Sequence, residues 1–267
     1  MQPEIFPLPM KNNHISVSVV MATYNGERYL KEQIASVLAE LQPGDELIVV
    51  DDASRDGTSG LLASVIWPSL RIVQNPSNIG VLRTFERGLM LARGGVVFLC
   101  DQDDIWLPGK RAAFINAFAA DNRTLVVVSD AQLIDGNGVM LAPSFMATRG
   151  GFKGGLLSTV VRNRYLGCAM ALRRDMLTPA LPIPRFVPMH DMWLGAVACV
   201  AGRVHYIAAP LSQYRRHGCN VSPSTRQGWL KMLRWRGQLL SALVLRFRQI
   251  LAFRRKIMVS PTLNSPQ

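Results

Sequence analysis

The stretch Val96-Val-Phe-Leu-Cys-Asp-Gln-Asp-Asp-Ile-Trp106 decides the fold class of this chain and indicates its chemistry. An apolar run of strand type ends abruptly in three carboxylates, Asp101, Asp103 and Asp104. Like charges a few Å apart repel each other, and carboxylate oxygens are ligands that suit Mg²⁺ or Mn²⁺. The cluster therefore predicts a divalent-metal site at the end of a strand. The alternative is a solvated acidic turn that caps a helix beginning near Pro108.

Strands and helices alternate along the first half of the chain. The patterns predict strands at residues 15–21, 46–50, 70–73 and 96–101, with helices at 27–41, after 57, at 81–93 and from about 108. Such alternation predicts an α/β fold with a doubly wound, mostly parallel, Rossmann-like sheet. Ligands of such sheets bind outside the carboxyl ends of the strands.

Three of these strand ends are polar: residues 22–26, residues 51–57 and the acidic cluster. We expect them to form one pocket, in which Tyr24 offers a face for a base and Asp52 an acceptor for the ring N–H of a pyrimidine. In the same pocket, Asp101 suits a ribose hydroxyl, and Asp103 suits a cation that bridges a diphosphate. The sequence has neither G-x-G-x-x-G after the first strand nor G-x-x-x-x-G-K-[ST], which excludes dinucleotide oxidoreductases and P-loop NTPases.

Length and composition predict one main domain, since 267 residues with 49% hydrophobic content can bury one large core. We find no secretory signal pattern and no apolar run of membrane-spanning length, so we expect a cytoplasmic protein. Four cysteines lie scattered without a C-x-x-C pair and are expected to be reduced and structural.

Charge is distributed unevenly. Residues 1–191 hold 18 Lys and Arg and 18 Asp and Glu, whereas residues 192–267 hold 12 Lys and Arg and no acid, so the net charge of +12 belongs to the last 76 residues. Nine of these cations lie at 226–256, interleaved with apolar residues. On a helix, one face would carry Trp229, Leu233, Leu240, Leu243, Val244, Phe247 and Leu251, with Lys231 and Arg234 opposite.

This pattern is typical of an interfacial helix on an anionic membrane surface, although Arg236 and Arg254 interrupt the apolar face. A helix packed on the domain and a nucleic-acid-binding tail are the alternatives. We expect a leader at 1–13, a catalytic domain at 14–225, a basic amphipathic segment at 226–258 and a tail at 259–267. Deletion of residues 226–267 is then expected to leave nucleotide binding intact.

The order and spacing of several motifs resemble family 2 glycosyltransferases with the GT-A fold. The resemblance covers roughly residues 15–222. It rests on Val19-Val-Met-Ala-Thr-Tyr-Asn-Gly26, Ile48-Val-Val-Asp-Asp-Ala-Ser54, Asp56-Gly57-Thr58, Asn78-Ile-Gly80, Asp101-Gln-Asp-Asp-Ile-Trp106, His190-Asp191-Met-Trp193 and Tyr214-Arg-Arg-His-Gly218.

The resemblance implies roles for individual residues. Asp191 would be the catalytic base, and Asp103 with His217 would bind Mg²⁺ or Mn²⁺. Nucleotide binding would fall to Ala22, Thr23, Tyr24, Asn25, Asp52, Arg83, Asp101 and Gln102. The acceptor pocket would be lined by Asp104, Trp106, His190, Trp193, Arg215 and Arg216, of which the two arginines could also assist at the diphosphate.

Simpler interpretations exist for several of these residues. A lone aspartate before an apolar helix, as at Asp191, is usually a helix N-cap. His217 without its context is an ordinary loop histidine. Trp106 and Trp193 are expected to pack at the pocket edge, with stacking on a sugar as the alternative.

The implied reaction is an inverting, metal-dependent transfer of a sugar from a nucleotide diphosphate to a hydroxyl group. The motif set is similar to that of bacterial rhamnosyltransferase-like members, which implies dTDP-L-rhamnose or a UDP-sugar as donor. Met192, Arg216 and Cys219 depart from that pattern. The acceptor would be a cell-envelope saccharide, such as a lipopolysaccharide intermediate, or a lipid-linked one. It would be reached from the inner face of the cytoplasmic membrane.

Two rival functions come from other classes. A sugar nucleotidyltransferase would need a Gly-rich basic loop after the first strand, which residues 22–26 do not supply. The other rival is a catalytically silent nucleotide- or carbohydrate-binding module that its basic tail recruits to a membrane.

Overall fold

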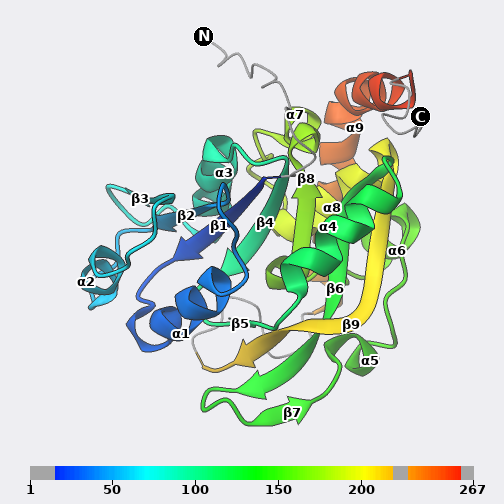
Figure 1. Ribbon diagram of the computed structural model, residues 1–267. Helices are drawn as coiled ribbons and strands as arrows, with labels where there is room; N and C mark the ends of the chain where they lie inside the picture. The colour runs from blue at the N-terminus through cyan, green and yellow to red at the C-terminus, as the bar shows by residue number, and fades with distance from the viewer. Residues whose placement is uncertain (1–15, 219–227, 260–267) are drawn as a thin grey trace.

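The computed structural model describes residues 16–218 and 228–259, which form one mixed nine-stranded sheet covered by helices on both faces (Figure 1). The strand order is β3-β2-β1-β4-β8-β6-β9-β5, with β7 paired to β6. The predicted leader (1–13) and all but the first residue of the predicted tail (259–267) lie outside the described residues, as does Cys219.

The first half of the chain forms the predicted parallel sheet. Strands β1 (Val17–Thr23), β2 (Glu46–Asp51), β3 (Leu70–Gln74) and β4 (Val96–Asp101) are joined in parallel register. They alternate with α1 (Glu27–Leu38), α2 (Thr58–Ala63) and α3 (Val81–Leu91). Helix α3 lies close to the sheet because Gly88 has no side chain: a Cβ there would meet a methyl group of Val20 at 2.3 Å.

The second half extends the sheet with strands of both directions. It comprises β5 (Ile105–Trp106), α4 (Lys110–Ala120), β6 (Thr124–Asp135), β7 (Met140–Ala142), α5 (Phe145–Thr148), α6 (Leu156–Val161), η1 (Gly167–Ala169), β8 (Met170–Arg173), η2 (Arg174–Met176), α7 (Leu177–Ala180), α8 (His190–Ala201), β9 (Arg203–Arg216) and α9 (Trp229–Val259). Strand β8 runs antiparallel to both β4 and β6, whereas β9 runs parallel to β6. The sheet is therefore mostly parallel, as expected, with antiparallel additions.

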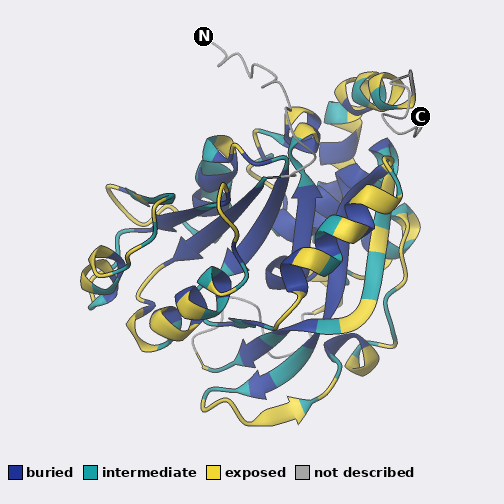
Figure 2. Ribbon diagram, viewed as in Figure 1, coloured by how far each residue is buried: buried dark blue, intermediate teal, exposed yellow. Residues whose placement is uncertain are grey.

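Alternate side chains of each strand enter two separate cores. Val19 and Met21 of β1 face α1 and α4, whereas Val20 faces α3, α8 and α9. Figure 2 shows β1, β2, β4 and β8 buried between the helical layers, whereas β7 and much of β9 are partly or fully exposed. This alternation is the period of two that strands impose, and burial of both faces explains the continuous apolar runs in the sequence.

Helix α9 packs on the domain with one face and exposes another. Leu239, Ala242, Leu243 and Ile250 are buried in the same core as α8. Of the apolar face predicted from the sequence, only Leu243 is buried in this way. Among the described residues, no helix has both the length and the apolar character that a membrane span needs.

Candidate functional site

The carboxyl ends of β1 and β4 are tied together by one side chain, Gln102. Its carbonyl oxygen accepts from the Thr23 hydroxyl and from the Tyr24 backbone N–H, each at 2.7 Å, and its amide donates to the Tyr24 carbonyl at 3.1 Å. The Tyr24 ring remains 42% exposed, as a stacking platform for a base requires. Gln102 therefore positions the loop that would hold the base.

Asp52 lies at the end of β2 and is only 3% exposed. Its carboxylate accepts from the backbone N–H groups of Ile79 and Gly80, both at 2.9 Å, and from the Asn75 amide at 2.7 Å. A carboxylate offers about four acceptor positions, so one is left for a ligand N–H. Asp52 thus organises the loop before α3 and keeps capacity for a base.

Asn25 joins the β1 loop to the β2 loop. Its backbone adopts a left-handed conformation with φ of 48°, which asparagine tolerates better than most residues. Its side-chain oxygen accepts from Arg55 N–H at 2.8 Å, and its N–H donates to Ser54 at 2.9 Å. Ala22 is 9% exposed at the end of the same strand. The structure therefore brings together the predicted residues 22–25, Asp52 and Gln102.

Asp104 is buried just after β4, and Asp101, the last residue of that strand, is half-buried. Burial and the charges of Asp104, Asp103 and Asp191 raise the pKa of Asp101 well above its usual value. Burial followed by the charge of Asp103 raises the pKa of Asp104 to about 7. One oxygen of Asp104 accepts from Arg215 N–H at 2.8 Å, and the other is buried without a hydrogen-bond partner.

The acidic cluster is not a helix cap, because α4 begins at Lys110 with Gly109 in the cap position and no side-chain cap. Instead, oxygen atoms of Asp101 and Asp104 lie within 4.8 Å of each other and of the Cys168 sulfur. Burial raises the pKa of the Cys168 thiol, which keeps it protonated and a poor ligand for a hard cation. The carboxylates remain the natural oxygen donors for Mg²⁺ or Mn²⁺.

Asp103 contacts His217, 114 residues further along the chain. The distance between His217 Nε2 and Asp103 Oδ2 is 2.8 Å, and each side chain is only partly exposed. The structure thus brings the two predicted metal ligands together, and His217 is not an isolated loop histidine.

Arg215 secures this pair rather than facing the pocket. Its guanidinium donates to the Asp103 carbonyl at 2.8 Å and to Glu32 at 2.6 Å, and the side chain is 3% exposed. It also lies over the Tyr29 ring. Arg215 therefore positions Asp103, whereas the partly exposed Arg216, which donates to the Tyr214 hydroxyl at 3.0 Å, remains the candidate for contact with a ligand.

Asp191 lies in the first turn of α8 and is 4% exposed. The cap position belongs to Met189, so the N-cap interpretation of Asp191 does not hold. Its Oδ1 accepts from Met192 N–H at 2.6 Å and from the Asn163 amide at 3.4 Å. Burial raises the pKa of Asp191 to about 6, and its charge acts on Asp101 across the site.

His190 lies between α3 and the acidic cluster. Its ring stacks on Phe85 at 4.2 Å between centroids, and its buried Nε2 has no hydrogen-bond partner. A Cβ placed on Gly167 would lie 3.2 Å from that nitrogen and 4.0 Å from an Asp101 oxygen, so both side chains converge on Gly167. Burial lowers the pKa of His190 to about 4, which keeps the imidazole neutral at pH 7.

Both predicted pocket tryptophans belong to the interior. Trp193 is completely buried and its indole donates to the Ala180 carbonyl at 2.8 Å. Trp106 is 3% exposed and packs against Phe98, with the Lys110 ammonium 4.3 Å from its ring. They are packing residues as expected, but in the interior rather than at the pocket edge, so stacking on a sugar is not open to them in this structure.

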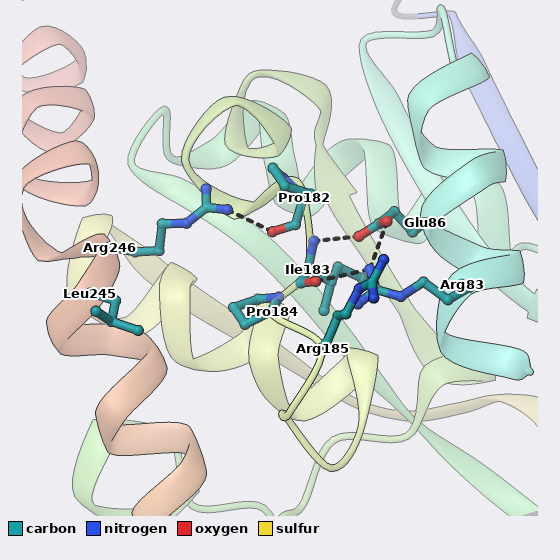
Figure 3. A pocket seen from close by; sticks show the side chains of 8 residues that line it. All are labelled: Arg83, Glu86, Pro182, Ile183, Pro184, Arg185, Leu245 and Arg246. Atoms are coloured by element: carbon teal, nitrogen blue, oxygen red, sulfur yellow. Dashed lines mark hydrogen bonds and ion pairs between the residues drawn. The ribbon is translucent and has the colours of Figure 1, made fainter.

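Arg83 is turned toward the loop after α7 (Figure 3). It pairs with Glu86 at 2.7 Å, donates to the Ile183 carbonyl at 3.0 Å, and lines a hollow of about 430 Å³ together with Arg185 and Arg246. The structure does not link Arg83 to the other predicted nucleotide residues.

Three side chains that carry no signal in the sequence support the site, two of them buried and one, Asn163, partly exposed. Lys110 is completely buried and donates to the Cys168 carbonyl at 2.6 Å and to the Ser212 hydroxyl at 2.8 Å. Gln33 donates to the Asp101 carbonyl at 3.0 Å, and Asn163 holds Asp191. A lysine nine residues after the end of β4 carries no sequence signal of burial, since lysine is almost always exposed.

The arrangement has two ends. Tyr24, Asp52 and Gln102 lie at the ends of β1, β2 and β4, whereas His190 and Asp191 open α8. The acidic cluster lies between them, and a divalent cation there would relieve the repulsion that raises the pKa values of Asp101 and Asp104. The residues present therefore fit a divalent cation, and that cation would in turn bind a group that carries negative charge.

Comparison with known proteins identifies the class. The family model for glycosyl transferase family 2 matches residues 18–178, and the chain belongs to this family. It is 27% identical over 219 residues to an uncharacterized glycosyltransferase of Nostoc sp., covering 77% of this chain and 66% of that protein. It is also 27% identical over 182 residues to the Escherichia coli UDP-Glc:alpha-D-GlcNAc-diphosphoundecaprenol beta-1,3-glucosyltransferase WfgD, covering 67% of each.

A further relative is the putative teichuronic acid biosynthesis glycosyltransferase TuaG of Bacillus subtilis. It is 34% identical over 96 residues, which cover 35% of this chain and 38% of TuaG. The chain thus spans from about a third to two thirds of the length of these relatives.

Solved structures confirm the GT-A-like fold. The chain is similar to Staphylococcus aureus TarS in complex with UDP-GlcNAc, with a TM-score of 0.63, 20% identity, and coverage of 93% of this chain and 74% of that one. It is also similar to the Pyrobaculum calidifontis mannosyltransferase PcManGT in complex with GDP-Man and Mn²⁺. That match has a TM-score of 0.58, 19% identity, and coverage of 88% and 64%.

Proposed function

We propose that the protein is an inverting glycosyltransferase that moves a sugar from a nucleotide diphosphate to an acceptor hydroxyl. The observation that carries the proposal is the placement of two carboxylates with different environments. Asp103 pairs with His217, while Asp191 is buried at the start of α8 with its pKa raised to about 6. A base whose pKa lies near the working pH is suited to accept a proton from a hydroxyl group.

In this proposal each residue has one task. Tyr24 and Asp52 hold the base, Asp101 binds the ribose, and Asp103 with His217 would bind Mg²⁺ or Mn²⁺. The bound cation would supply charge neutralisation for the departing diphosphate. Asp191 takes the acceptor proton as the acceptor oxygen attacks the anomeric carbon from the face opposite the diphosphate, and one displacement inverts the configuration. Asn163 keeps the Asp191 carboxylate in place.

We propose dTDP-L-rhamnose or a UDP-sugar as the donor. The support is the sequence resemblance to rhamnosyltransferase-like members and the nucleotide-sugars in the complexes of similar structures. We propose a cell-envelope saccharide or a lipid-linked saccharide as the acceptor, in line with the diphosphoundecaprenol-linked acceptor of WfgD and with the putative role of TuaG in teichuronic acid biosynthesis.

We also propose that the protein lies at the inner face of the cytoplasmic membrane without spanning it. The support is the charge of the C-terminal segment, since α9 carries eight Lys and Arg and no acid. Anionic lipids attract such segments by about 1 kcal/mol for each cation near the surface.

A donor panel tests the proposal. The purified chain is mixed with Mn²⁺ and either dTDP-L-rhamnose, UDP-glucose or UDP-GlcNAc, and the melting temperature and the released nucleoside diphosphate are measured. We expect one donor to raise the melting temperature with Mn²⁺ but not with EDTA, because a ligand that binds only the folded state stabilises it.

The Asp191→Asn variant separates catalysis from binding. It is expected to retain the donor-induced thermal shift and to lose nucleotide release, and retained release would remove Asp191 as the base. If donors shift the melting temperature of the wild-type chain but no nucleoside diphosphate is released with any donor or any envelope saccharide acceptor, the alternative of a catalytically silent binding module is favoured.

A further inference from the structure

Helix α9 presents two apolar faces, of which the structure covers only one. Leu239, Ala242 and Ile250 pack on the domain. About 100° further round the helix, at 3.6 residues per turn, runs a second row that we call the apolar stripe. The apolar stripe comprises Trp229, Leu233, Leu240, Val244, Phe247 and Met258, which are between 45% and 75% exposed. An exposed apolar row of this length marks an interaction surface.

Three arginines of α9 bond to the domain, and two of them, Arg236 and Arg254, are those that interrupt the apolar face expected from the sequence. Arg236 donates to the Val160 and Val161 carbonyls at the end of α6. Arg246 donates to the Leu181 and Pro182 carbonyls just after α7, and Arg254 donates to the Val200 carbonyl in the last turn of α8. Cations at helix C-termini satisfy carbonyls that lack partners.

The other exposed cations are placed differently. Arg248 and Arg255 are exposed and lie on the outer border of the apolar stripe, and Arg234 is exposed on the outer side of the helix. With no acid in α9 to balance them, an apolar row bordered by arginines has the chemistry of the interface of an anionic bilayer. A hydrophobic protein partner would account for the apolar row but not for the uncompensated charge.

Helix α6 adds apolar side chains to the same flank. Leu157 and Val161, one turn apart, are 78% and 57% exposed. The bonds from Arg236 place the end of α6 beside the part of α9 that carries Leu233 and Leu240. The two neighbouring helices therefore both expose apolar side chains.

This surface leads to the end of the site that carries His190 and Asp191, which we call the acceptor end. Asn163 follows α6 by two residues, and its amide donates to the Asp191 carboxylate at 3.4 Å. The chain that exposes Leu157 and Val161 therefore leads directly to the residue that holds the proposed base.

We propose that α6 and the apolar stripe of α9 dock on an anionic bilayer, and that this docking presents the acceptor end of the site to substrates anchored in the membrane. The proposal deepens the proposed membrane location by naming the face that docks, and it rests on the proposed glycosyl transfer only for the identity of the acceptor, since docking itself requires no turnover. The capping arginines of α9 are not lipid contacts in this arrangement.

Two neighbouring residues of α9 provide a matched test. Val244 is 75% and Leu245 73% exposed, but Leu245 lies about 100° away from Val244 and further still from the centre of the stripe. Binding of the full-length variants Val244→Asp and Leu245→Asp to vesicles of phosphatidylglycerol and phosphatidylcholine is measured by co-sedimentation. Both variants change the net charge equally. We expect Val244→Asp to weaken partitioning about tenfold, the loss of one buried aliphatic side chain, and Leu245→Asp to leave it near the wild-type value.

A second pair tests α6. Leu157→Asp is expected to weaken partitioning as well, whereas Ile66→Asp, at a residue that is 94% exposed before β3, is not. Donor-induced thermal shifts without vesicles show that each variant is folded and binds its nucleotide-sugar.

Equal binding by the Val244 and Leu245 variants would overturn the proposed face, and no binding by the wild-type chain would overturn docking altogether. A wild-type dimer in light scattering that Val244→Asp dissociates, without vesicle binding, would assign the stripe to a second copy instead. Failure of all three donors with intact vesicle binding would reject the proposed donors and leave docking standing.

Discussion

At the scale of single residues, Asp191 links burial to pH. Its pKa rises from 3.8 to about 6 because the carboxylate is buried, so between these values the folded state binds more protons than the unfolded state. Stability contributed by the protonated form is therefore lost as the pH rises from about 4 to about 6. The shift corresponds to about 3 kcal/mol at most.

The Asp191→Asn variant makes this effect measurable. We expect the difference in free energy of unfolding, variant minus wild type, to increase by about 3 kcal/mol between pH 4 and pH 7, because the amide cannot ionise. Urea unfolding of both chains at each pH gives the difference. His190, whose pKa is lowered, titrates in the same pH range, but it is present in both chains, so its contribution cancels in the difference. A difference that does not change with pH would show that Asp191 is solvated.

Lys110 illustrates what a single buried cation contributes to the acidic cluster. Its ammonium is bound by the Cys168 carbonyl and Ser212, and its charge acts on Asp104 and Asp101, while burial lowers its own pKa to about 8. We expect Lys110→Met to lower the free energy of unfolding by about 3 kcal/mol at pH 7.5, because one side of a buried charge arrangement is removed.

The loss should be smaller at pH 5, where Asp104, whose pKa is raised to about 7, is protonated and needs no counter-charge. Urea unfolding at both pH values measures it, with the exposed Lys31→Met as the control, for which we expect a change within about 0.5 kcal/mol. An equal loss at both pH values for Lys110→Met would mean that Lys110 contributes through packing rather than through charge.

At the scale of elements, α9 is anchored by its arginines as well as by its apolar face. Arg246 bonds the Leu181 and Pro182 carbonyls at 2.9 and 2.8 Å, whereas Arg248, two residues on, is exposed and makes no hydrogen bond with the described residues. We expect Arg246→Ala to cost about 2 kcal/mol, the usual value of a charged hydrogen bond, and Arg248→Ala to cost less than about 0.5 kcal/mol. Thermal unfolding without lipid compares them, and equal values would show that the caps add nothing.

Sequence patterns predict some elements well and others poorly. Strands β1 to β4 and helices α1 and α3 lie within about two or three residues of expectation because apolar runs, Gly stops and acidic strand ends mark them. Strands β6 and β9 are 12 and 14 residues long and shift register at three places. Such irregular pairing depends on the partner strand, which local periodicity does not contain.

The site shows the same division. Residues that belong to a strand end, such as Gln102 and Asp52, meet because parallel strands end at one edge of a sheet. The contacts of Asn163 with Asp191 and of Lys110 with Ser212 come from irregular segments, so spacing alone could not reveal them. Arg83 does not join the other predicted nucleotide-binding residues for a related reason. Its position on α3 is as expected, but its side chain points to Glu86 and the Ile183 carbonyl, with which it bonds.

At the scale of the whole molecule, charge and core divide the chain at different places. All of the net charge of +12 belongs to residues 192–267, which suggests a detachable basic segment. The hydrophobic core is not divided at that place. One cluster contains Val20, Phe85 and Trp193 together with three residues of α9, which are Leu239, Leu243 and Ile250. One segment therefore completes the fold and also carries the surface charge.

This dual use predicts the outcome of a truncation. A chain that ends at residue 228 loses four side chains from the core, three of them large aliphatic groups that contribute about 2 kcal/mol each when buried. The sum is comparable with the total stability of many domains, so we expect the truncated chain to lose cooperative thermal unfolding and the donor-induced thermal shift. The full-length variant Arg234→Gln/Arg248→Gln/Arg255→Gln removes surface charge and keeps the helix. It should melt within a few degrees of the wild-type temperature while binding anionic vesicles more weakly. A truncated chain that melts like the wild type and binds donor would show instead that the catalytic domain ends before α9, as the charge pattern alone suggests.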